Sequence, residues 1–100
     1  MHIRVEADGE AQLVDADNFK RFHIEVGDPG MGDDAIAKAL ASIARCEGSD
    51  YWVDVGRLVA ISGRSGDMVW QASLRTMLEA AQKFGWASAD GQSVKAHVKR

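Results

Sequence analysis

A row of large apolar residues at helical spacing constrains the fold of this chain more than any other feature. The row follows the spacing i, i+4, i+7, i+8, i+11, which places its members on one face of an α-helix: Trp70, Leu74, Met77, Leu78 and Ala81. Ser65 or Asp67 is a suitable N-cap, and Gly85 is a suitable stop. The pattern predicts a long helix over residues 66–84 with one buried face.

A second apolar stripe precedes this helix and follows a glycine-rich loop at residues 27–32. Its members recur at spacings of three and four: Ile36, Ala39, Leu40, Ile43 and Cys46. Asp33 or Asp34 is predicted to cap this helix, and Gly48 to end it. We therefore expect Cys46 to be a small core residue on the inward face.

The N-terminal part alternates apolar and polar residues, which is typical of half-buried strands. A three-residue loop from Asp8 to Glu10 would pair Ala7 with Ala11 and Val5 with Leu13. A two-residue loop at Asp8-Gly9 remains the alternative. With a third strand over residues 19–26, the pattern predicts a three-stranded antiparallel meander at 1–26 that needs a helix to cover it.

The central segment begins with a short strand, Tyr51–Val53. Asp54 is then expected to cap a short helix that buries Val55, Leu58 and Ile61, although a longer strand also fits. The charge of Arg57 within that alternative strand favours the helix. At the C-terminal end, Trp86 opens a predicted hairpin that turns at Asp90-Gly91 and returns with alternate residues pointing inward: Val94, Ala96 and Val98.

The order of these elements is helix, short strand, helix, helix, hairpin, and it resembles a winged-helix module. The predicted fold is a single α+β domain over residues 1–100. It combines the meander at 1–26 with a winged-helix-like helical part at 33–100 that ends in a C-terminal β-hairpin. Trp52, Trp70 and Trp86 are expected at the centre of its core, and an aromatic patch for a partner is the alternative.

Composition and charge narrow the classes of function. Apolar residues at 46% and charged residues at 27% are typical of a globular domain. The longest apolar runs are too short to span a membrane, and the alternation of apolar and polar residues at 1–6 is not expected of a secretory signal. The single cysteine favours a reducing compartment, the cytoplasm. The net charge of −3 does not favour nucleic acid, but residues 1–34 carry −6 and residues 35–100 carry +3.

A basic strand face supports nucleic-acid binding as the alternative hypothesis. Lys95, His97 and Lys99 share one face of the last strand, where they could follow a phosphate backbone. The resemblance to a winged helix would place the first half of the long helix in a groove of DNA, with Arg64, Gln71 and Arg75 exposed. Asp67 would oppose such binding. A solvated strand face explains the same pattern more simply.

Catalytic and metal motifs find little support in the sequence. Gly27-x-x-Gly30-x-Gly32 lacks the Gly-Lys-Ser/Thr ending of a phosphate-binding loop. The three histidines, His2, His23 and His97, have no neighbouring ligands, and we expect no metal and no cofactor. A small enzyme or ligand binder around His23 and Arg21 is a third hypothesis without a motif. A ligand site would require a pocket lined by polar side chains.

The sequence is best explained by a small non-catalytic, cytoplasmic interaction domain. We expect it to bind a partner protein or to self-associate, through a strand edge or through the exposed side of the long helix.

Overall fold

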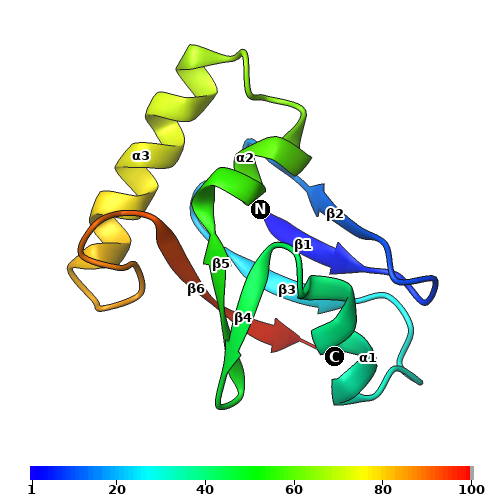
Figure 1. The fold of residues 1–100 in the computed structure, drawn as a ribbon. Coiled ribbons are helices and arrows are strands. Elements are labelled where there is room, and N and C mark those ends of the chain that lie inside the picture. Colours follow the sequence, from blue (N-terminus) through cyan, green and yellow to red (C-terminus); the bar gives the residue numbers. More distant parts are fainter. Residues whose placement is uncertain (100) are drawn as a thin grey trace.

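The computed structural model describes residues 1–99 as a small α+β domain built on one six-stranded mixed sheet (Figure 1). The strand order in the sheet is β2-β1-β3-β6-β5-β4. The elements follow the chain as β1 (His2–Val5), β2 (Ala11–Val14), β3 (His23–Val26), α1 (Asp33–Leu40), β4 (Ala44–Glu47), β5 (Asp50–Asp54), α2 (Val55–Ser62), α3 (Met68–Gln82) and β6 (Ser93–Lys99).

The predicted N-terminal meander is wrong, because β1 lies between β2 and β3 and pairs with them in opposite senses. β1 is antiparallel to β2 but parallel to β3, with Ile3 opposite Ile24. A parallel pair requires the chain to return to the starting end of its partner. The long connection over residues 6–22, which contains β2, makes this return. Residues 19–22 belong to that connection and are not part of a strand.

The first hairpin has the predicted loop length but a shifted register. The Glu6 N–H donates to the Glu10 carbonyl at 2.8 Å, so the loop is Ala7-Asp8-Gly9. Gly9 occupies the last loop position with a φ of +89°, which glycine adopts without strain. Val5 therefore pairs with Ala11 rather than with Leu13. The shift from the predicted register is an even number of residues, so each side chain keeps its predicted face.

The predicted winged-helix part is also wrong, because β6 is an interior strand of the sheet. It pairs antiparallel with β5 over five residues and parallel with β3 through Ile24–Val98 and Glu25–Lys99. Of the expected hairpin, only a short arm remains, in which Ala87 bridges to Val94. The pairing of β6 is therefore mainly with strands that are distant in the sequence, and not with the segment that precedes it.

The helix expected after the glycine-rich loop ends early, at Leu40. Residues Ala44–Glu47 form β4 and pair with β5 instead, and Gly48, with a φ of +64°, forms the turn between them. Cys46 is consequently exposed, not part of the core. The N-cap is Gly32 rather than Asp33 or Asp34, which lie in the first helical turn.

The two other helices begin at the predicted caps. The Asp54 carboxylate accepts a hydrogen bond from the Arg57 N–H at 2.9 Å and starts α2. The Asp67 carboxylate accepts from the Trp70 N–H at 3.0 Å and starts α3. These caps confirm the helical interpretation of residues 54–62 and the long helix that follows.

Removing the cap of α3 provides a test of this local structure. We expect Asp67→Ala to lower the free energy of unfolding by about 1 kcal/mol, because the Trp70 N–H loses its acceptor. Asp67→Asn keeps a side-chain acceptor and should recover most of the loss. Urea denaturation measures both, and equal losses for the two variants would contradict the capping role.

The sheet has one core face and one open face. The helices cover the core face, whose buried strand residues include Ile3, Val5, Ile24, Val26, Val53, Val94 and Ala96. By strand alternation, the opposite face carries polar side chains from four strands, among them His2, Arg4, His23, Glu25, Asp50, Trp52, Lys95 and His97. The expectation of three core tryptophans holds only for Trp70, because Trp52 is half-buried on the open face and Trp86 is 55% exposed.

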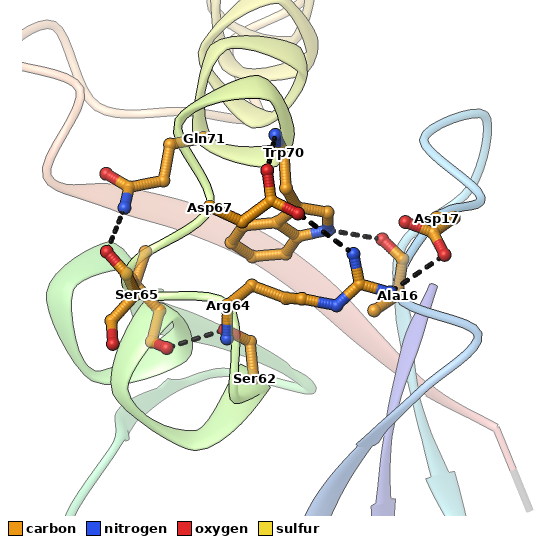
Figure 2. Close-up of polar contacts among 9 residues, drawn as sticks. Ala16, Asp17, Ser62, Arg64, Ser65, Asp67, Trp70 and Gln71 are labelled. Atoms are coloured by element: carbon orange, nitrogen blue, oxygen red, sulfur yellow. Dashed lines mark hydrogen bonds and ion pairs between the residues drawn. The ribbon is translucent and has the colours of Figure 1, made fainter.

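α3 lies at one side of the sheet (Figure 1). The segment between β2 and β3 contacts it there. Figure 2 shows the Trp70 indole beside this segment, and its N–H donates to the Ala16 carbonyl at 2.8 Å. Arg64 reaches between Asp17 at 2.9 Å and Asp67 at 3.4 Å. The Phe19 ring contacts Trp70 as well. These contacts set the distance between α3 and the sheet.

Candidate binding groove

A groove of about 490 Å³ lies where α3, the segment before β3 and β6 meet. Each segment supplies one wall, so the groove exists only because distant parts of the chain converge. The segment before β3 and the start of β3 contribute Phe19, Lys20, Arg21, Phe22 and His23. The other lining residues are Met77, Ala80, Ala81, Phe84 and Trp86 from α3 and the residues after it, and Val94, Lys95, His97 and Lys99 from β6.

The floor of the groove is apolar and continues to the surface at the end of α3. Phe84 and Trp86 stack with ring centroids 5.0 Å apart. Phe84 is 68% exposed and Trp86 is 55% exposed, so neither ring is covered by the fold. Trp86 lies beside β6, because its carbonyl accepts a hydrogen bond from the Lys95 N–H at 2.7 Å. An uncovered aromatic pair of this kind is a typical contact point for a partner.

The rim of the groove is cationic. It carries Lys20 and Arg21 on one side and Lys95 and Lys99 on the other, and no acidic side chain of the described chain lines it. Within residues 1–99, Lys20, Arg21 and Lys99 have no carboxylate within ion-pair distance. An anionic group can therefore bind these three charges without the loss of an ion pair formed within residues 1–99.

Lys95, His97 and Lys99 form a cationic row on β6, and Asp50 pairs with the first two of these side chains. Its carboxylate accepts a hydrogen bond from His97 and lies 3.5 Å from the Lys95 ammonium. The hydrogen bond from His97 is the main reason that the pKa of Asp50 is lowered, and the charge of Lys95 adds to it. Lys95 also lies 6.0 Å from the centre of the Trp52 ring. Lys95 and His97 are thus partly engaged within the domain.

His23 lines the groove at the start of β3. Its ring stacks on His2 at 4.9 Å, and His2 in turn pairs with Glu25 at 3.0 Å. Burial lowers the pKa of His23, and the charges of His2, Lys99 and the N-terminal amine lower it further, against the opposing charge of Glu25. The imidazole is therefore neutral near pH 7.

The structure divides the six residues of the nucleic-acid hypothesis among three places. Lys95, His97 and Lys99 line the groove as one row on β6. Gln71 and Arg75 line a separate hollow between α2, α3 and the loop at 89–92. Arg64 is held by Asp17 and Asp67. The set does not form one surface.

The groove does include Arg21 and His23, the two residues of the ligand-binder hypothesis. Sequence reasoning missed Lys20 and Phe84, and it considered Trp86 as part of an aromatic patch for a partner only as the alternative to a core position. A signal existed for Phe84, which continues the helical stripe at i+14 from Trp70. The apolar stripe extends beyond the core that it covers, and Phe84, which lies past the core, lines the groove.

Comparison of the chain with protein-family models, with curated proteins and with solved structures gives no match. Residues 1–99 contain no cluster of three or more His, Cys, Asp or Glu side chains arranged to hold a metal ion. In the same part of the chain, no helix has the length and apolar character to cross a membrane. A function for the groove must therefore follow from its own geometry and chemistry.

Proposed function

We propose that this chain is a small non-catalytic interaction domain that binds a segment of a partner protein in the groove. One observation carries the proposal: the exposed Phe84–Trp86 pair continues an apolar floor beside three cations that have no carboxylate partner within residues 1–99. Tryptophan and arginine are the side chains that most often dominate the energy of protein interfaces. The exposed free thiol of Cys46 supports the cytoplasm as the compartment.

The size of the surface favours a polypeptide over a small molecule. Lys95 and Lys99 are four residues apart on one strand, a distance of about 13 Å. A compact ligand on the floor would leave either the aromatic pair or the Lys99 end uncovered. An extended segment of a partner can contact both ends.

The charge of the rim favours a different protein over a second copy of this chain. In a two-fold dimer the same patch faces itself. Arg21 and Lys99 would then face their own copies with no acid in the groove to separate them. Like charges in such positions oppose association.

Single-stranded nucleic acid is a second candidate ligand, since stacked aromatic rings beside cations are used for that purpose. Phe84 and Trp86 are already stacked on each other, however, with an interplanar angle of 27°. The acidic N-terminal third, with its charge of −6, would also repel a long polyanion. These features make a short peptide segment the better fit.

Selection from a display library of random peptides tests the proposed function. The immobilised baits are the native domain and the double variant Phe84→Ser with Trp86→Ser, which keeps the fold because both rings are exposed. We expect peptides that bind the native domain and not the variant, and a domain that remains monomeric by light scattering. Failure to enrich any peptide on the native domain over the variant would contradict the proposal, as would dimerisation that depends on the two rings.

A further inference from the structure

We infer that the partner segment is extended and acidic, with Asp or Glu residues that alternate with apolar residues along β6. This inference rests on the proposed function and adds the chemistry of the partner. It follows from the spacing of the cations, from the location of the apolar floor and from the existing ion pairs at the rim.

The spacing of the cationic row fits an extended chain. Lys95, His97 and Lys99 occupy alternate positions of one strand and therefore lie about 7 Å apart on the same face. An extended peptide repeats its side-chain directions at the same interval. Its acidic side chains can thus face the row together, while every intervening side chain points the other way. A helical peptide with the same alternation would distribute its acids around its whole circumference.

The apolar floor provides a site for the intervening side chains. Phe22, Met77, Ala81 and Val94 line the groove together with the cations of β6 and those of the segment before β3. Lys20 and Arg21 supply that segment with charge. A chain that alternates acidic and apolar residues therefore matches both features at once, whereas a uniformly acidic chain would leave the floor unused.

The existing ion pairs predict which end of the groove recognises charge. Asp50 already forms ion pairs with Lys95 and His97, and Trp86 lies beside Lys95. At the other end, Lys99 has no carboxylate partner within residues 1–99. The acid of the partner that faces Lys99 should thus contribute more to binding than the acids that face Lys95 and His97. Consequently, Lys99→Gln should weaken binding more than Lys95→Gln.

Binding of such a segment should strengthen as the pH falls from about 7.5 to about 5.5. His23 faces His2, Glu25, Lys99 and the N-terminal amine, and burial together with the nearby positive charges lowers its pKa. A bound carboxylate favours the protonated ring, so affinity rises as pH falls toward that lowered pKa. The acids of the peptide, with pKa values near 4, stay ionised over this range. His23→Gln should flatten the dependence, and an affinity that falls with pH would contradict it.

Calorimetric titration with designed peptides of about eight residues tests the inference. The first peptide alternates Glu with Leu or Phe, the second replaces each Glu with Gln, and the third has the composition of the first with acids and apolar residues in two blocks. A single-stranded oligonucleotide is the fourth probe. We expect the alternating acidic peptide to bind at least about tenfold more tightly than the amide and block versions. Its advantage should shrink as salt rises from about 0.05 M to about 0.5 M.

The outcomes separate the inference from the proposed function. Equal binding of the acidic and amide peptides overturns the inference but leaves a peptide-binding groove. Equal binding of the alternating and block peptides overturns the extended alternation. If only the oligonucleotide binds, or if no peptide binds and the display selection also fails, both are overturned.

Discussion

Reversal of two charges in the groove, Arg21→Glu together with Lys99→Glu, is expected to weaken binding of the alternating acidic peptide about a hundredfold. Each substitution replaces attraction with repulsion, and about 1.4 kcal/mol at each position corresponds to a factor of ten. Both side chains are exposed and neither has a carboxylate partner within residues 1–99. The free energy of unfolding should therefore change by less than about 0.5 kcal/mol. Calorimetry measures the affinity and urea denaturation the stability.

A matched control removes the effect of net charge. Arg57→Glu with Arg75→Glu changes the charge of the domain by the same amount on side chains outside the groove. Arg57 is on α2, and Arg75 lines the hollow on the other side of α3. We expect this variant to lose less than about threefold in affinity, since well-separated surface charges are largely screened. Equal losses for the two double variants would show that the groove has no specific role.

Trp70→Ala is expected to lower the free energy of unfolding by about 3–5 kcal/mol, the largest effect of any single substitution considered. Trp70 is only 3% exposed, contacts Phe19 and donates its indole N–H to the Ala16 carbonyl. It joins α3 to the segment between β2 and β3, and so it also sets the width of the groove. The loss of the ring leaves a cavity and removes this connection. Urea denaturation monitored by circular dichroism provides the measurement.

Two further variants separate the contributions of the tryptophans. Trp70→Phe keeps an aromatic ring and loses the hydrogen bond, which should cost about 1 kcal/mol beyond any change in packing. Trp86→Ala should change stability by less than about 0.5 kcal/mol, because its ring is mostly exposed. A large loss of unfolding free energy for Trp86→Ala and a small one for Trp70→Ala would show that Trp86, and not Trp70, belongs to the core.

Local signals in the sequence predicted the helices better than the sheet. The stripe from Trp70 to Leu78 and the caps at Asp54 and Asp67 act within one or two turns, and the structure contains all of them. The choice of strand partners does not depend on such signals. β3 carries the same alternation whether it pairs with β2 or with β1. Competition between distant strands determines which of them becomes its partner.

The stripe that begins at Ile36 shows how the same pattern can mislead. Ile36, Leu40 and Ile43 are all buried, as the helical period predicts. Helix α1 nevertheless ends at Leu40, because β5 provides a pairing partner for residues 44–47. Burial was thus predicted correctly for three positions, and the conformation of the last part was not. Cys46 became exposed for that reason.

Only part of the groove could be predicted from the sequence. Alternation placed Lys95, His97 and Lys99 on one strand face, and the structure places all three in the groove. Arg21 and His23 were considered together, but their proximity to β6 depends on the unpredicted parallel pairing of β3 with β6. Trp86 was expected in the core, with an aromatic patch for a partner as the alternative, and Phe84 was only the last residue of the predicted helix. A periodic pattern does not show where the sheet beneath the helix ends.

Titration of the ¹⁵N-labelled domain with the alternating acidic peptide, followed by nuclear magnetic resonance, shows directly whether the groove is the binding site. We expect the indole N–H signal of Trp86 and the amide signals of Arg21 and Lys99 to shift together with one saturation curve. The indole signal of Trp70, which is bonded to Ala16, and the amide signals around Arg75 should stay in place. Saturable shifts around Arg75, with Trp86 and Lys99 unchanged, would show that the groove is not the binding site.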